Sequence, residues 1–199
     1  MIGDGSEKQE RTIEALRRGS LALPQLRAWT NDLVARHAAE ARPIAGRGFP
    51  RLSQYFPDVL LQRTLAVSVT RVTFPPLSSQ FGLSELAELE HMSFSAITFA
   101  GMIFAHTSVT AEATFFHEMV HVVQWNTLGV DDFMLTSGAG LVECGYAHSP
   151  FEALTYDLQH QFERGVPLPD LVQRIAEHAV QTRAWAADFY QRLGVPIGG

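Results

Sequence analysis

The chain has 199 residues, of which 46% are apolar, and a single cysteine, Cys144. This length and apolar fraction are sufficient for one hydrophobic core and exclude a mainly disordered chain. A lone cysteine excludes a disulfide framework and any metal site built from several thiolates.

Charge is distributed unevenly around the formal net value of −6. Residues 1–51 hold nine lysines and arginines against six acidic residues, whereas residues 72–163 hold eleven acidic residues and neither lysine nor arginine. A fold built around the second stretch carries a negative field that attracts metal ions and basic side chains. We therefore expect no nucleic-acid partner.

The sequence also predicts a protein without a membrane segment. No apolar run reaches the roughly 18 residues that span a bilayer, and residues 1–20 lack the basic-then-apolar order of a cleavable signal peptide. We expect a cytoplasmic location, with export by a route that needs no signal peptide as the alternative.

The N-terminal quarter is predicted to be helical. An apolar stripe indicates helices over residues 6–18 and 24–41. Two prolines and two glycines within residues 41–50 indicate a linker. We therefore divide the chain into a helical N-terminal extension, residues 1–50, that packs on a main domain, residues 51–199.

The main domain is predicted to combine few strands with many helices. Residues 65–74 are rich in β-branched side chains and predict a strand that Pro75 and Pro76 end. Residues 95–105 predict a second strand, or a hairpin that bends near Gly101. The fold class is therefore α+β, mainly helical with a small sheet. Helices are expected over residues 57–63, 110–128, 131–144, 150–164 and 169–193.

The apolar helix over residues 110–128 contains an HExxH pattern. We expect Thr110 as its N-cap and Gly129 as its C-terminal stop. His117 and His121 lie one turn apart on one helical face, so both imidazoles can bind one ion. Glu118 can reach a water on that ion without binding the ion itself. This arrangement suits Zn²⁺, which lowers the pKa of its bound water to about 7.

A third ligand is needed, because catalytic zinc usually takes three protein ligands. The longer metzincin motif would have a glycine and a third histidine at positions that here hold Gln124 and Thr127, so the third ligand must come from further downstream. We favour Glu152, because Ser149 and Pro150 before it are suited to the cap and first turn of a helix. The other candidates are Glu143, His148, Asp157 and His160.

Three segments, AITFAGMIFA, TFFHEMVHVVQW and GYAHSPFEALTYDLQ, together resemble the gluzincin branch of zinc metallopeptidases. They resemble more closely small, poorly characterised bacterial zincin-like domains, and the resemblance covers about residues 95–164. It implies a zincin-like fold in which an edge strand, mapped to residues 97–105, precedes the HExxH helix and holds an extended peptide by β-augmentation. It also implies Glu152 as the third zinc ligand.

Two positions depart from the pattern of these families. Tyr156 stands where many gluzincins carry an aspartate that orients the first zinc histidine, and Leu154 stands where the small domains often carry a second glutamate. The group that orients His117 is therefore left open between Asp157, Glu143 and a backbone carbonyl.

A hydrolase of this type also needs a hydrogen-bond donor for the oxyanion of its tetrahedral intermediate. Because residues 72–163 contain no lysine or arginine, the local donors are tyrosine and histidine side chains. We expect Tyr146 to serve as this catalytic donor, with His148 and Tyr156 as alternatives.

The function that the sequence predicts is a zinc-dependent metallopeptidase. Water on Zn²⁺, deprotonated by Glu118, attacks the peptide bond of a peptide or protein substrate. The negative field favours substrates with lysine or arginine near the cleaved bond. The alternative is a non-catalytic zincin-like domain that keeps its metal as a binding or structural module. The basic N-terminal segment is either a lid over the site or an ordinary packed helix.

Overall fold

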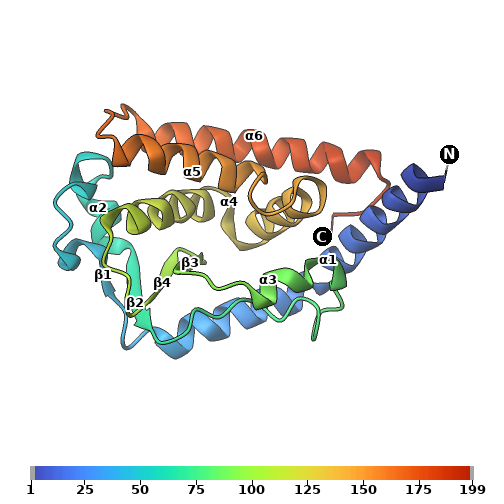
Figure 1. The fold of residues 1–199 in the computed structure, drawn as a ribbon, viewed down its shortest axis with the longest axis horizontal. Helices are drawn as coiled ribbons and strands as arrows, with labels where there is room; N and C mark the ends of the chain where they lie inside the picture. The colour runs from blue at the N-terminus through green and yellow to red at the C-terminus, as the bar shows by residue number, and fades with distance from the viewer. Residues whose placement is uncertain (1–2, 198–199) are drawn as a thin grey trace.

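The computed structural model describes residues 3–197 and has a mainly helical α+β fold with a four-stranded mixed sheet (Figure 1). Its strands are β1 (Arg42–Pro43), β2 (Leu65–Val69), β3 (Ala96–Phe99) and β4 (Met102–His106). Its α-helices are α1 (Gly3–His37), α2 (Asp58–Arg63), α3 (Ala87–His91), α4 (Glu112–Cys144), α5 (Pro150–Glu163) and α6 (Leu171–Arg192). Short 3₁₀ helices are η1 (Ile44–Arg47), η2 (Leu52–Gln54) and η3 (Ser84–Leu86). None of the helices within residues 3–197 combines the length and apolarity that a bilayer crossing requires.

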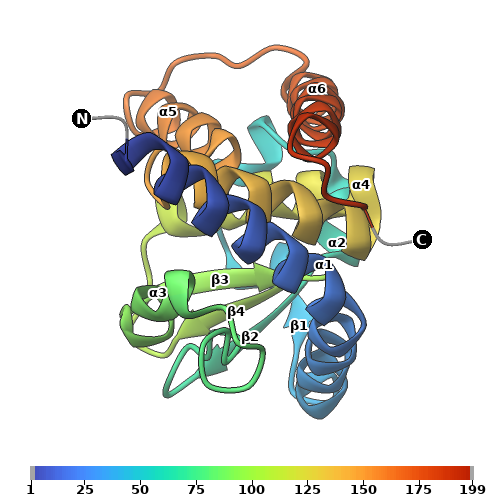
Figure 2. The same cartoon turned by 90° about the vertical axis from the view of Figure 1, so that its right-hand side faces the viewer.

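Helix α4 runs through the middle of the molecule. The helices α5 and α6 lie on one side of α4, and the sheet lies on its other side (Figure 1). Figure 2 shows the same layers from the side, with the C-terminal half of α1 beyond the sheet. This order places α4 where its side chains are shielded from water in both directions.

The sheet has the strand order β1-β2-β4-β3, with β2 and β4 parallel and the other neighbours antiparallel. The predicted hairpin is confirmed: Ala100 and Gly101, with φ of 47° and 79°, form the two-residue turn between β3 and β4. The edge strands are therefore β1 and β3. The expectation that an edge strand over residues 97–105 directly precedes the HExxH helix is wrong for β4, which precedes α4 but is an inner strand. Strand β2 is shorter than predicted and ends at Val69, because its partner β4 ends opposite, at His106.

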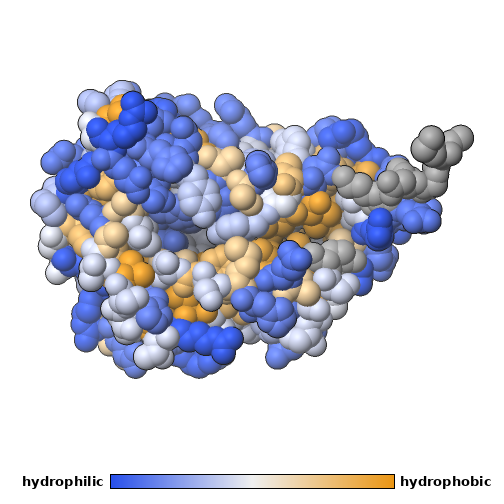
Figure 3. Space-filling model, viewed as in Figure 1, coloured by the Kyte–Doolittle hydropathy of each residue, from blue (hydrophilic) through white to orange (hydrophobic). Residues whose placement is uncertain are grey.

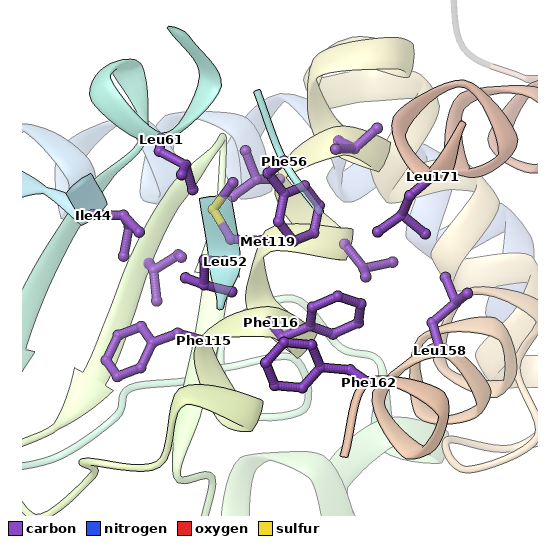
Figure 4. Packing of buried hydrophobic residues seen from close by; sticks show 14 of the residues in the cluster. Ile44, Leu52, Phe56, Leu61, Phe115, Phe116, Met119, Leu158, Phe162 and Leu171 are labelled. Carbon is purple, nitrogen blue, oxygen red and sulfur yellow. The ribbon is translucent and has the colours of Figure 1, made fainter. Parts of the chain in front are cut away.

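The alternating side chains of β4 divide the core into two parts. Ile103 faces the cluster that α4 shares with α5 and α6, and Phe104 faces the cluster covered by α1. In the first cluster, Phe116 of α4 stacks on Phe162 of α5 with ring centroids 4.4 Å apart (Figure 4). This stacking fixes the C-terminal end of α5 against the beginning of α4.

The expectation of two N-terminal helices is wrong, because α1 continues through Pro24 without a break. A proline inside a helix costs about 3 kcal/mol, since it removes a hydrogen bond and crowds the preceding turn. Packing on both sides of Pro24 compensates: Leu16 and Leu23 contact α4 and α6, and Leu33 contacts the sheet.

Helix α4 contains the two helices expected over residues 110–128 and 131–144, which meet at a kink, and differs from the expectation at its start. It begins at Glu112, so Ala111 and not Thr110 occupies the N-cap position. Gly129, with φ 74° and ψ 177°, is not helical and separates the two helical halves of α4 at a kink, which confirms the predicted stop at this residue. A residue with a side chain rarely adopts this conformation, which explains the glycine.

We predict that Gly129→Ala destabilises the protein by about 1–3 kcal/mol, because alanine is strained in this backbone conformation. A Cβ atom at Gly129 would meet nothing within 4 Å, so the cost is conformational and not steric. Gly46→Ala is the matched control, since its Cβ also meets nothing and its φ is not in the left-handed range. Urea unfolding of both variants checks the prediction, which fails if the two lose equal stability.

Candidate metal centre

The centre lies between the first half of α4 and the antiparallel helix α5. Helix α5 begins close to α4 because Gly140 leaves room: a Cβ there would lie 3.0 Å from Cδ of Pro150 and 3.2 Å from Cβ of Ser149. The predicted start of α5 is confirmed, with Ser149 as N-cap residue and Pro150 in the first turn, although the Ser149 side chain makes no capping hydrogen bond. Glu152, in the same turn, lies beside the histidines of α4.

His117, His121 and Glu152 form a buried group that can hold a metal ion, with the possible ligand atoms of all three within 4.8 Å of one another. The Nε2 atoms of the two histidines are 3.2 Å apart. Oε2 of Glu152 lies 3.6 Å from Nε2 of His117, and Oε1 lies 3.4 Å from Nε2 of His121. One carboxylate therefore faces both imidazoles.

These separations fit a tetrahedral ion. Two ligands, each at 2.0–2.1 Å from tetrahedral Zn²⁺, lie about 3.3 Å apart, close to the three distances between the donor atoms of this group. Oε2 of Glu152 is buried and has no hydrogen-bond partner among the described residues. A buried oxygen left in this state costs free energy unless a cation is bound to it.

Two glutamines hold the histidines in position. Nδ1 of His117 is 3.0 Å from Oε1 of Gln159, and Nδ1 of His121 is 2.8 Å from Oε1 of Gln124. Because an amide oxygen only accepts, Nδ1 of each imidazole carries a proton, and Nε2 of each is the atom left to bind an ion. The question of which group orients His117 is thus answered by Gln159, and Asp157 instead bonds Gln161 at the surface.

Electrostatics favour a positive charge between these groups. Burial opposes ionisation of Glu152, but His121 and His117 hold the pKa of its carboxyl well below the usual range. Burial also opposes protonation of His121, but the Glu152 carboxylate raises the pKa of this imidazole to about 9. A divalent cation bound between these groups would take the place of the proton that His121 carries next to Glu152.

Glu118 is buried next to the group and has its own partner. The Thr98 hydroxyl on the edge strand β3 donates to Oε2 of Glu118 at 2.7 Å. Burial raises the pKa of the Glu118 carboxyl above its ordinary value, and the charges of His117 and His121 only partly offset this effect. A carboxylate with a raised pKa is suited to accept and return a proton near neutral pH.

Two tyrosines complete the wall of the site. Tyr146 and Tyr156 share a hydrogen bond, and the Tyr156 ring packs against His117 with centroids 4.8 Å apart. Burial, and next the charge of Glu152, raise the pKa of Tyr146. Its hydroxyl therefore stays protonated at neutral pH and can donate a hydrogen bond.

The structure does not bring the other candidate ligands into this group. Their side chains are exposed on the surface of the molecule. These residues are Glu143, His148, Asp157 and His160, and Cys144 is exposed as well.

Sequence reasoning missed Thr98 and Gln159. For Gln159 a signal exists, because it follows Glu152 by seven residues and so lies on the same face of α5, two turns on. For Thr98 there is none, since a threonine in a strand is ordinary. Gln124, three residues after His121 on the same helix, has a positioning role through its hydrogen bond to His121.

Comparison of the chain with models of protein families, with curated protein sequences and with solved structures gave no match. What the site can do therefore follows from its own geometry.

We predict that the purified protein binds about one zinc ion per chain and that Glu152→Ala loses most of it, because one of three ligands is removed. Elemental analysis after dialysis against a weak chelator measures the ratio. Glu143→Ala is the control, since Glu143 is an exposed carboxylate outside the group. Full zinc content in Glu152→Ala would show that Glu152 is not a ligand.

We also predict that Gln159→Ala weakens zinc affinity by about 10–100-fold, because His117 loses the acceptor that orients it. Gln161→Ala is the matched control on the same helix, since Gln161 bonds only Asp157 at the surface. Competition with a chromogenic chelator compares the affinities. Equal affinity of the two variants would contradict the positioning role.

Proposed function

We propose that the chain is a zinc-dependent metallopeptidase with a zincin-like fold of the gluzincin type. The observation that carries this proposal is the convergence of two imidazoles and one carboxylate, with a second carboxylate of raised pKa, Glu118, buried beside them. Two imidazoles and one carboxylate are the ligand set of catalytic zinc in several hydrolases.

Bound zinc supplies a Lewis acid and lowers the pKa of water to about 7. Glu118 accepts the proton of the attacking water and returns it to the leaving amine. The Thr98 hydrogen bond holds the Glu118 carboxylate in one orientation for this transfer. Tyr146, protonated and at the wall of the site, donates a hydrogen bond to the oxyanion.

The substrate in this proposal is a peptide bond. A preference for lysine or arginine near that bond follows from the negative charge of residues 72–163 and stays a prediction. The alternative function is a metal-binding domain without catalysis, and it differs from the first in one measurable respect, hydrolysis.

We predict that Glu118→Gln lowers hydrolysis by about 10²–10⁴-fold while zinc stays bound, because glutamine cannot accept the proton. The measurement uses the zinc-loaded protein, a fluorogenic peptide library, and elemental analysis of the same samples. Glu143→Gln is the control for loss of one negative charge at an exposed position. If neither wild type nor control cleaves any library member with zinc bound, the non-catalytic function replaces the peptidase.

A further inference from the structure

A large apolar cavity extends from the candidate metal centre to the wall that α1 forms. Its volume is about 460 Å³, within the range of pockets that bind small molecules. Figure 3 shows apolar side chains gathered along this face, between α5 and α3. The apolar lining includes Leu16, Leu23, Leu26, Leu83, Phe94 and Leu141.

The ionisable groups of the cavity lie almost entirely at its metal-centre end. The lining there includes His117, Glu118 and Glu152, whereas the α1 end is lined by leucines and alanine. Tyr190 is the exception, and its hydroxyl already donates to the Leu135 carbonyl at 3.3 Å. None of the described lining residues is a lysine or an arginine. An occupant of the α1 end must therefore be uncharged and apolar.

The edge strand β3 does not offer all of its outward backbone groups to an incoming peptide. The His106 N–H donates to the Ser95 carbonyl, so the antiparallel alternation turns the backbone of Ala96 and Thr98 away from β4. The outward carbonyl of Thr98 already accepts a hydrogen bond of 3.1 Å from the Trp125 indole. A pairing peptide strand would lose this acceptor.

A peptide backbone is also poorly matched to the interior of the cavity. Each of its N–H and C=O groups loses water there and finds mainly leucine and phenylalanine side chains, such as Leu83 and Phe94, in place of partners. An unbranched alkyl chain has no polar groups to satisfy and gains free energy for each methylene buried. The cavity therefore suits an alkyl chain better than a segment of peptide.

We propose that the cavity binds a long, unbranched acyl chain, so that the substrate is the amide bond of an N-acylated amino acid or peptide. This inference rests on the proposed function, since it names the substrate of the same site. In the reaction, the C–N bond of the amide breaks and the acyl carbon bonds to the oxygen of water, giving a carboxylic acid. Glu118 transfers a proton of that water to the nitrogen, which leaves as the amine.

Binding is tested without hydrolysis by using neutral alcohols. The 1-alkanols of six, eight, ten and twelve carbons are measured by displacement of the fluorescent apolar probe N-phenyl-1-naphthylamine from the wild-type protein. We expect the dissociation constant to fall about fourfold for each added methylene. No dependence on chain length beyond six carbons would overturn the proposal.

Two variants place this binding in the cavity. Gly19 of α1 and Gly138 of α4 both line it, and a Cβ at either site meets only one atom, Leu83 Cδ2 at 4.0 Å or the Tyr190 hydroxyl at 3.9 Å. Leucine fills the space in each case and suits a helix better than glycine. We expect dodecanol to bind at least about tenfold more weakly to Gly19→Leu and Gly138→Leu, because the leucine side chain occupies space that the alkyl chain needs. Ala184→Leu, exposed on α6, is the control and should bind as the wild type does.

Unchanged dodecanol affinity in both filled variants, with thermal unfolding showing them folded, would overturn the proposal. A measurement of hydrolysis then distinguishes the acyl-chain inference from the proposed function. For the zinc-loaded protein we expect kcat/KM to be at least about 100-fold higher for N-dodecanoylglycine than for N-acetylglycine.

Equal rates on the two substrates would overturn the acyl-chain inference and leave an amide hydrolase standing. Alkanol binding that depends on chain length and is lost in the filled variants, with no hydrolysis of any amide, would overturn the proposed function and the amide substrate that rests on it. In that outcome the cavity still binds alkyl chains.

Discussion

Burial of the Glu152 carboxylate is the constraint on which the local structure depends, because a carboxylate without water or a partner is very unfavourable inside a protein. The two imidazoles at 3.4 and 3.6 Å compensate for it, and they reach this position only because α5 packs antiparallel on α4. That packing in turn needs Gly140 without a side chain. The burial of Glu152 thus accounts for three residues of α4: Gly140, His117 and His121.

Much of the site could be predicted because it depends on local spacing. Helix geometry places His117 and His121 on one face, with Glu118 next to the first. Capping rules predict the start of α5 at Ser149 and Pro150. Thr98 could not be predicted, since its contact with Glu118 depends on how the β3 edge meets α4, which no spacing encodes. The unbroken α1 was missed for a similar reason: partners far along the sequence outweigh the local preference of Pro24.

The hydrogen-bond partner of His117 is the neutral amide of Gln159, so it adds no negative charge to the centre. A carboxylate in that place would make an imidazole ligand more basic and add a negative charge. Gln159 instead is neutral, and its Nε2 donates to the exposed carboxylate of Glu163 at 3.0 Å. The nearest negative charge in this chain of hydrogen bonds, on Glu163, therefore does not contact His117 directly. It lies at the surface, where water and salt screen it.

The position of α1 has a consequence for the order of folding. This helix is synthesised before its partners, Leu135 of α4 and Phe189 of α6, which lie more than a hundred residues later in the sequence. Contacts so distant in sequence form late, because the entropy of closing a long loop is lost before they can form. During synthesis, Leu16 and Leu23 of α1 therefore stay uncovered until α6 has emerged, and apolar surface exposed in this way is prone to aggregation.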